Sequence, residues 1–408
     1  MATRTVGSGK DYSTIAAALS AANADDIISI DAGTYTEYHL DVYDDGLTIK
    51  AATPTTGGPT ENTVIMDGEG STSKEYAFYS FASGCIYQHI TFKNYEEYAI
   101  RRGTLDGASL TLSGCLIYGC DGPAISHLGY NASTPAEIYD SMIIVDEGRA
   151  LNIGGNSTVI IKNSVLAVNA EDEAVIVSSV SYPNITASHC TFIGRGWNGS
   201  DGRHYHLVNQ VAKVDNCIVY GGNGNGIGSH THNNNLVYLT HTDSEPYVEW
   251  AADSYDGTAV SAGSGDITGD PKFVTAPTHG SITPFNMDLN LQASSPAVNA
   301  GSSAVTTDIS GSARDSSPDI GAYEYISAAS AWSDYGSYSD PRFLNTGDVV
   351  AGSVMSQDYQ LKAPASPGVD QAPRVLNTYG IIFRNRTKPY AASHGGDPDN
   401  YFSGTIGE

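Results

Sequence analysis

Basic residues are scarce in this chain of 408 residues. Lys and Arg together number 20, against 45 Asp and Glu, so the formal net charge is −25. A general nucleic-acid binder needs a basic surface to displace the counterions of phosphates, and an anionic membrane attracts the same basic residues. Neither nucleic acid nor membrane is therefore expected as a partner, whereas cations or neutral glycans suit the charge.

Long apolar runs and paired cysteine motifs are missing as well. No window approaches 18 apolar residues, so no membrane-spanning helix is expected. Residues 1–5 lack the apolar core of a secretory signal, although a Met added to a mature chain would hide one. The cysteines contain no Cys-x-x-Cys pair and are odd in number, which predicts neither a disulfide framework nor a zinc site; they are Cys85, Cys115, Cys120, Cys190 and Cys217.

What the chain does contain is an internal repeat of about 25 residues. Each repeat has a short strand of alternating apolar and polar residues, a polar pair, and a second short apolar run. Period-2 alternation with β-branched residues predicts strands, and a repeat this short fits one coil of a parallel β-helix. The equivalent anchor positions, spaced 25, 26, 23, 26 and 27 residues apart, are Ile90, Cys115, Ser141, Ser164, Cys190 and Cys217.

Stacked coils would bring the anchor positions into a ladder. Neighbouring strands lie about 4.8 Å apart, so equivalent side chains stack on one another. We expect the Cys and Ser anchors to face inward as a ladder of small side chains, because free Cys behaves as a small hydrophobe. Reactive thiols are the less favoured alternative.

Residues 1–25 are predicted to form an N-terminal cap, because the end of a solenoid needs one. Ser13 is the candidate N-cap of a short helix. One face of that helix is expected to carry Ile15, Ala18, Leu19 and Ala22.

Two motifs at this end carry a resemblance to a known superfamily. Asp11-Tyr-x-Thr-Ile-x-x-Ala-Leu and Asp26-Ile-Ile-x-Ile-x-x-Gly-Thr-Tyr35 resemble the cap and first coil of pectin-lyase-like right-handed parallel β-helix proteins. The resemblance extends over roughly residues 5–325. It implies an all-β fold, a right-handed parallel β-helix with an N-terminal capping helix and an irregular C-terminal extension. Lyases, glycoside hydrolases, esterases, phage tailspikes and inert virion proteins share this fold, so it does not decide the function.

The remaining chain is divided by motif and composition. Asp270-Pro-Lys-Phe273 and the residues after it resemble the closing segment of many β-helix surface proteins, and the pattern partly recurs from Asp340. In the first copy, Asp319 and Glu324 are expected to pair with Arg314. The predicted domains after the cap are the β-helix at 26–265, a closing β module at 266–328, a second terminal module at 329–370 and an extended C-terminal arm at 371–408.

Three carboxylates are candidates for catalysis. Counting six residues beyond each anchor gives Glu96, Asp121 and Glu147 in successive coils, and the resemblance implies that superfamily enzymes place acids on the outer face of neighbouring coils. Rungs about 5 Å apart match a retaining glycosidase pair, and alternate rungs match an inverting pair. The column could equally bind Ca²⁺ through its oxygens, or be a solvated acidic turn, which is the favoured interpretation.

Other candidate sites are less specific. The Asn-Thr-Asp, Asp-Asp and Gly-His-Gly series of polygalacturonase-like hydrolases and the Gln-Asp-Thr-Leu of pectin methylesterases are absent from the sequence. Trp197 and the tyrosines could stack on sugars. Two i,i+2 histidine pairs could bind a transition metal but more often serve turns, so no metal is assigned; they are His204 with His206 and His230 with His232.

The predicted arm concentrates basic and aromatic side chains, which suits a segment that becomes ordered on a partner. The expected docking residues are Phe383, Arg384, Arg386, Lys388, Tyr390, Tyr401 and Phe402.

Together these features favour a non-enzymatic virion surface protein: a phage capsid decoration, head-fibre or tail component. It would attach to capsid or tail proteins through the arm, form a homotrimer and bind host glycans. The alternative is a polysaccharide-degrading tailspike, a lyase or a glycoside hydrolase. A third hypothesis is a secreted or bacterial cell-surface adhesin. No cofactor beyond Ca²⁺ is considered.

Overall fold

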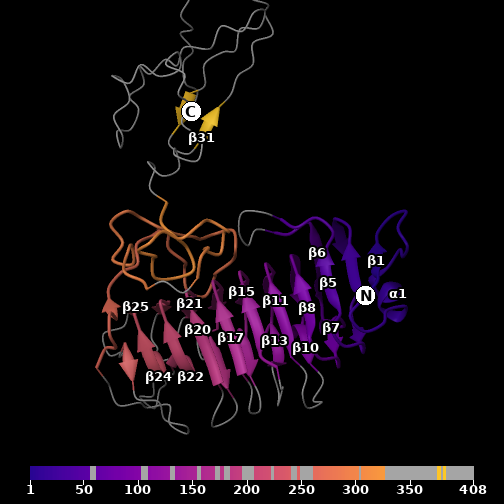
Figure 1. The fold of residues 1–408 in the computed structure, drawn as a ribbon, viewed down its shortest axis with the longest axis horizontal. Helices are drawn as coiled ribbons and strands as arrows, with labels where there is room; N and C mark the ends of the chain where they lie inside the picture. Colours follow the sequence, from indigo (N-terminus) through magenta and orange to yellow (C-terminus); the bar gives the residue numbers. More distant parts are fainter. Residues whose placement is uncertain are drawn as a thin grey trace, which may run out of the picture. The chain divides into compact units, whose positions relative to one another are not determined.

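The computed structural model describes residues 1–326, 375–377 and 380–382, except within 1–326 for the segments 56–60, 103–108, 129–133, 154–157, 171–174, 179–183, 195–205, 222–224, 240–245, 249–260 and 303–304. Two compact units are formed, Met1–Tyr325 and Ile326–Glu408. The first unit is a right-handed parallel β-helix, as predicted, and its coils follow one another along the stack in Figure 1.

Each coil contributes a strand to each of three parallel ladders. The first ladder holds β4 (Leu40–Val42), β7 (Tyr76–Ser80), β10 (Tyr98–Arg102), β13 (Ile125–Leu128), β16 (Leu151–Ile153), β19 (Ile176–Ser178) and β26 (Tyr247–Val248). The second holds β1 (Thr3–Val6), β2 (Ile27–Ile30), β5 (Thr48–Ala51), β8 (Cys85–Gln88), β11 (Leu110–Ser113), β14 (Ala136–Tyr139), β17 (Thr158–Lys162) and β20 (Asn184–Ser188).

Two long strands, β22 (His206–Asp215) and β24 (Asn225–Asn233), take part in both of these ladders. The third ladder is a sheet of its own, with β3 (Gly33–Tyr35), β6 (Val64–Ser71), β9 (Ile90–Tyr95), β12 (Leu116–Cys120), β15 (Met142–Val145), β18 (Val165–Val168), β21 (Thr191–Gly194), β23 (Ile218–Gly221), β25 (Leu236–Leu239) and β27 (Ile267–Thr268).

The predicted anchor ladder is confirmed by the register of the third ladder. Leu116 pairs with Thr91 and with Met142, so the residues before them share one position in the coil. The small anchors are fully buried and joined by hydrogen bonds as well as by packing. The backbone N–H of Cys115 donates to Ser141 Oγ at 3.2 Å, and that of Ser141 donates to Ser164 Oγ at 3.3 Å.

Strand register adds Asn235 and Asp266 to the anchor positions. The residue before each anchor turns the chain between the second and third ladders. At eight successive corners it has a left-handed φ of 47–75°, a region that Gly, Asn, Asp and His enter more readily than other residues. An added Cβ at one of these corners, Gly114, would lie 2.5 Å from His89 Nδ1. The corner residues are His89, Gly114, Asp140, Asn163, His189, Asn216, Asn234 and Gly265.

The short N-terminal helix is α1 (Ile15–Ser20), and it lies beside β1 at the end of the stack (Figure 1). Its N-cap is Thr14, which corrects the expectation of Ser13. Thr14 has the extended backbone of a cap, and its Oγ1 accepts from the backbone N–H of Ala17 at 3.2 Å. Ile15 and Leu19 are buried, as their helical spacing predicts.

The segment 266–326 packs against the outer surface of the third ladder. It contains β28 (Phe273–Thr275) and β29 (Asp288–Leu291), an antiparallel pair. Its apolar side chains cover those that the ladder turns outward, and the shared cluster includes Leu116, Ile144, Val165, Ile218, Phe273, Leu289, Leu291, Ile309 and Ile320. The segment therefore covers a side of the β-helix in addition to following its last coil (Figure 1).

Arg314 anchors this segment. Its Nη1 lies 3.0 Å from Glu324 Oε2, with both side chains buried, which confirms the predicted pair. The expectation for Asp319 was wrong, because Arg314 reaches its backbone carbonyl instead. The Asp319 carboxylate accepts the backbone N–H groups of Asn299 and Tyr325.

Of the second unit the structure describes an antiparallel hairpin, β30 (Val375–Asn377) and β31 (Gly380–Ile382). The predicted module 329–370 and the rest of the arm at 371–408 lie outside the described residues. Within the described part of the chain, no helix is long and apolar enough to cross a membrane.

Candidate functional site

The structure places two of the three predicted carboxylates in one column and replaces the third. The backbone N–H of Asp121 donates to the Tyr95 carbonyl at 3.4 Å, which sets Asp121 in register with Glu96. The N–H of Asp146 donates to the Cys120 carbonyl at 3.0 Å, so Asp146 is in register with Asp121. Glu147 is displaced by one residue from this column.

A β-bulge explains the error. Strand pairing shifts in β12 between Ile117 and Cys120, where Gly119 adopts a left-handed φ of 65°. Cys120, five residues beyond its anchor, therefore pairs with Val145, four residues beyond the next anchor. Counting a constant six residues from each anchor ignores the extra residue of the bulge, and therefore selects Glu147 in place of Asp146.

The column continues into an amide at the next rung. Asn169 donates from Nδ2 to Asp146 Oδ1 at 2.8 Å, and it also bonds the backbone of Ile282 through both side-chain atoms. Asp121 and Asp146 are exposed, whereas Glu96 is half-buried. Among the described residues, no group of three or more His, Cys, Asp or Glu side chains is arranged to hold a metal ion. Calcium binding by the column stays a prediction.

A second feature, which the sequence did not reveal, is a continuous strip of rings on the outer side of β7 and on the residues that flank β4 and β7. We call it the aromatic strip, and its ring-to-ring contacts follow one another without a break. The centroids of Tyr43 and Phe81 are 5.1 Å apart with the rings within 6° of parallel. The strip consists of Tyr43, Phe81, Tyr79, Tyr76, His39 and Tyr38, with the remaining neighbouring centroids 4.1–5.5 Å apart.

Charged groups frame the strip. The Arg101 guanidinium lies over the rings of Tyr76 and Tyr79, at 5.5 and 5.2 Å from their centroids, and 3.7 Å from Glu75. Asp41 accepts the Tyr43 hydroxyl at 3.0 Å, and this hydrogen bond raises the pKa of the Tyr43 phenol. The strip therefore combines neutral ring surfaces with hydrogen-bonding groups of both signs.

Strand register brings these groups together. Asp41 pairs with Tyr79, and Tyr79 pairs with Arg101, so a carboxylate, a ring and a guanidinium occupy consecutive rungs of the first ladder. In β7 the side chains of Ala77 and Phe78 are buried in the core. Tyr76 and Tyr79, on either side of this buried pair, are only partly buried and belong to the outer surface.

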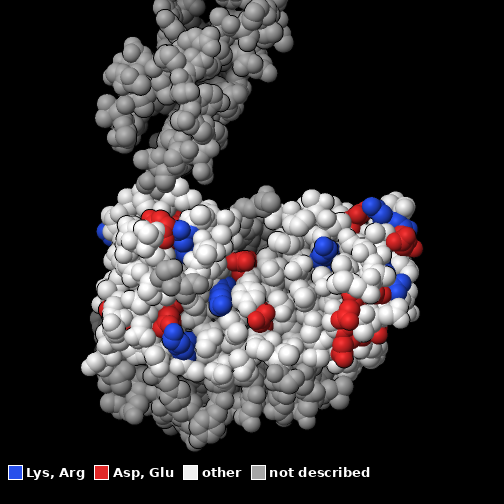
Figure 2. Space-filling model, viewed as in Figure 1, with Lys and Arg blue, Asp and Glu red and all other residues white. Residues whose placement is uncertain are grey.

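The aromatic strip and the acidic column adjoin. The backbone N–H of Glu96 donates to the Lys74 carbonyl at 3.1 Å, and that of Glu97 donates to the Glu75 carbonyl at 3.0 Å. The column thus starts at the corner where the strip's own coil enters the first ladder. Figure 2 shows that charged side chains are sparse over the face it displays, with several acidic residues near the N-terminal end of the stack.

The other predicted site residues are not brought into this region by the described structure. Trp197, His204 and the arm residues from Phe383 to Phe402 lie outside the described residues. His232 meets a carboxylate, because its Nδ1 lies 2.5 Å from Asp266 Oδ2. Asp266 also accepts the backbone N–H of Asn235 at 2.8 Å, so this histidine belongs to the end of the anchor ladder.

Comparisons with known proteins find distant similarities among solved structures. No family model and no curated protein matches the chain. Among solved structures, pectate lyase Pel9A has a TM-score of 0.45 at 16% identity, covering 80% of this chain and 97% of that one. The pectin methylesterase of Aspergillus niger scores 0.38 at 19% identity, with 64% and 91% covered. A rhamnogalacturonan lyase scores 0.37 at 12% identity, with 72% and 97% covered. The neighbours are pectin-lyase-like parallel β-helix proteins, and at these identities the likeness concerns the fold alone.

Proposed function

We propose that this chain is a carbohydrate-binding β-helix protein that holds a polysaccharide against the aromatic strip. The observation that carries the proposal is the unbroken series of six rings on and beside the outer side of β7. Tyr43 is 67% exposed and Tyr38 is 42% exposed, although large apolar groups are seldom left in contiguous exposed patches without a partner. Aromatic faces offer the flat apolar surface on which the C–H faces of sugar rings pack.

The charges around the strip favour a glycan over other partners. Arg101 and Asp41 supply a donor and an acceptor beside the rings, which suits hydroxyl-rich ligands. The overall charge of −25 opposes phosphate-rich partners. Because Tyr76 and Tyr79 stand on a paired strand, few of their degrees of freedom remain to be lost on binding.

Binding of neutral and acidic polysaccharides by calorimetry or affinity electrophoresis tests this proposal. Tyr79→Ala and Phe81→Ala should each lower the affinity by about tenfold, because each removes one stacking surface. Phe285→Ala is the matched control, since Phe285 is an aromatic residue of 66% exposure in the 266–326 segment. Equal affinities in all four proteins would contradict the proposal.

Polysaccharide cleavage is a second candidate, favoured by the carboxylate column next to the strip. Asp121 and Asp146 occupy neighbouring rungs, about 4.8 Å apart along the ladder. Two carboxylates at such a spacing can divide the roles of general acid and nucleophile on a glycan bound to the strip. Release of reducing ends would show cleavage of either kind; absorbance from unsaturated sugars would then indicate a lyase, and its absence a hydrolase.

Attachment to a virion is a separate proposal, which concerns a different part of the chain. The basic and aromatic residues of 371–408 support an arm that docks on an acidic capsid or tail protein, and host glycans would then be the ligand of the strip. Truncation at Ala372 should abolish assembly onto the partner while leaving glycan binding intact. A truncated chain that still assembles would remove the arm from the proposal. Light scattering of the full-length chain and of the truncated chain gives their molar masses and tests whether the protein is a homotrimer.

A further inference from the structure

The interior of the β-helix contains an arginine that has no carboxylate partner among the residues that the structure describes. Arg102 is 2% exposed at the end of β10. Its backbone N–H donates to Ser126 Oγ at 3.1 Å, and its Nη1 donates to the Ser109 carbonyl at 3.2 Å. Its Nη2 is buried and has no hydrogen-bond partner. Arg102 forms no ion pair with any residue in the described part of the chain.

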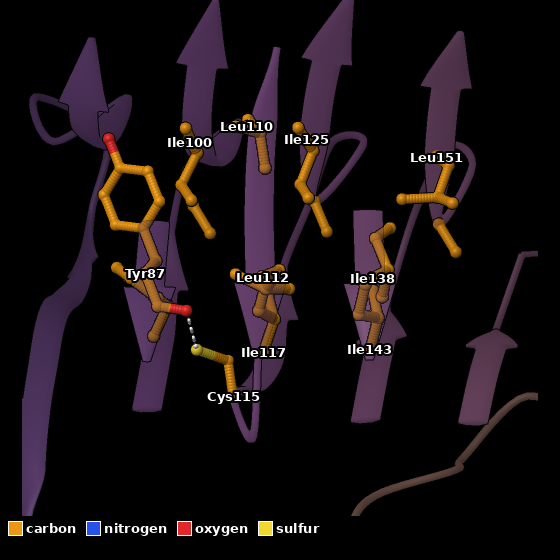
Figure 3. Close-up of a cluster of buried hydrophobic side chains, with 14 of the residues drawn as sticks. Tyr87, Ile100, Leu110, Leu112, Cys115, Ile117, Ile125, Ile138, Ile143 and Leu151 are labelled. Carbon is orange, nitrogen blue, oxygen red and sulfur yellow. Dashed lines mark hydrogen bonds between the residues drawn. The ribbon is translucent and has the colours of Figure 1, made fainter. Parts of the chain in front are cut away.

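Two further orphan polar atoms belong to the same layer of the core. Ser80 pairs with Arg102 on the neighbouring rung, so both side chains enter the interior from the same side. Ser80 Oγ and Tyr87 OH are fully buried and have no hydrogen-bond partner. In Figure 3 the Tyr87 ring crosses the interior from β8, with its hydroxyl on the side of Ile100 and away from Cys115.

Among the described residues of this layer, no protein group supplies the missing negative charge. Desolvation by burial raises the pKa of the Cys85 thiol and of the Tyr87 phenol, which keeps both groups neutral. The same desolvation lowers the pKa of Arg102. A buried charge without a partner costs several kcal/mol, and buried polar atoms without partners are rare in folded proteins.

We propose that a small monovalent anion of the size of chloride binds inside the β-helix, between Arg102 Nη2, Ser80 Oγ and Tyr87 OH. Ser80 lies beside Arg102 on the neighbouring rung, and both side chains oppose the rise in the pKa of the Tyr87 phenol that burial causes, which places the three groups close together. The anion neutralises the guanidinium and accepts the two hydroxyl hydrogens. It is a structural ligand of the two coils that contain β7 and β10, on the inner side of β7, whose outer side carries part of the aromatic strip.

Thermal unfolding in sodium chloride and in sodium gluconate at equal ionic strength tests this site, because gluconate is too large to enter. A ligand that binds the native state alone raises the Tm with its concentration. The Tm should rise by about 2 °C for each tenfold increase in chloride above the dissociation constant, and gluconate should not produce this rise. Equal melting curves in the two salts would overturn the proposal.

Variants separate this site from general salt effects. Arg102→Gln should remove the chloride dependence, whereas Arg101→Gln should keep it, because the Arg101 side chain is 40% exposed and next to Glu75 on the outer surface. Should Arg102→Gln fail to fold, bromide soaked into crystals of the unaltered protein gives an independent answer. An anomalous peak within hydrogen-bonding distance of Arg102 Nη2 supports the anion, and a water molecule there without anomalous signal excludes it.

Discussion

Asp146 follows Asp121 directly in the outer column of the β-helix, through the 3.0 Å hydrogen bond from its backbone N–H to the Cys120 carbonyl. This hydrogen bond shows that Asp146 and not the adjacent Glu147 lies beside Asp121 in the column, which the sequence alone cannot decide. It also makes Glu147 a built-in control, because Glu147 is exposed as well and lies one residue away.

The first prediction concerns cleavage by this column. If the chain cleaves the glycan that it binds, Asp146→Asn should lower the turnover by at least about 100-fold, because a general acid or base contributes that much. Glu147→Gln should change turnover by less than about twofold. Reducing-end assays on the two variants measure the difference, and glycan binding by both shows that they are folded. The opposite ranking would show that the register does not define the site.

The second prediction concerns the buried pair of Arg314 and Glu324. Arg314→Met should destabilise the protein by about 3–5 kcal/mol, because it leaves a buried carboxylate without its counter-charge. Urea unfolding followed by tyrosine fluorescence measures the loss. The matched control is Lys10→Met, since Lys10 and Asp31 form an exposed pair at 3.2 Å that contributes about 0–1 kcal/mol. Equal losses in the two variants would show that burial of the pair has no special effect.

The third prediction concerns the cysteines. Burial raises the pKa of the Cys115 and Cys120 thiols to about 12, so almost no thiolate is present at pH 8. All five cysteines are free and buried. The native protein should therefore react with a disulfide reagent at least 100-fold more slowly than the protein in urea. Rapid labelling of a native cysteine would revive the reactive-thiol alternative.

The fourth prediction concerns pH. Desolvation lowers the pKa of buried His189 to about 3, with a smaller contribution from Arg314. The unfolded chain, with an ordinary histidine near 6.5, therefore binds more protons between pH 3 and 6.5, and the free energy of unfolding rises with pH across that window. His189→Asn, which suits the left-handed corner, should reduce this rise by about 3 kcal/mol.

Asp319 acts in the opposite direction and provides a check on that result. Desolvation raises its pKa to about 6, above the ordinary value of 3.8. The native state then binds the extra proton, so this group lowers stability as pH rises from about 4 to 6. The free energy of unfolding of His189→Asn should accordingly be flat or falling over this range. A rise as steep as in the unaltered protein would exclude His189 as its source.

Several features were predictable from the sequence because they repeat locally. The anchors from Ile90 to Cys217 recur because the same buried position in every coil accepts only side chains that fit the core. The Arg314–Glu324 pair was predictable from a motif only ten residues long. The aromatic strip was not predictable from the sequence, because Tyr43 and Phe81 are 38 residues apart and do not follow the 25-residue period that revealed the coils.

By itself, then, the sequence determined a parallel β-helix with an inward ladder of small side chains, since strand alternation and coil length are properties of neighbouring residues. Tertiary structure alone decided which residues of different coils share a rung. One bulge at Gly119 moved the third carboxylate of the column from Glu147 to Asp146. Coil stacking likewise joined Tyr43 to Phe81 outside and enclosed Arg102 inside, because loop lengths and bulges set the register between distant segments.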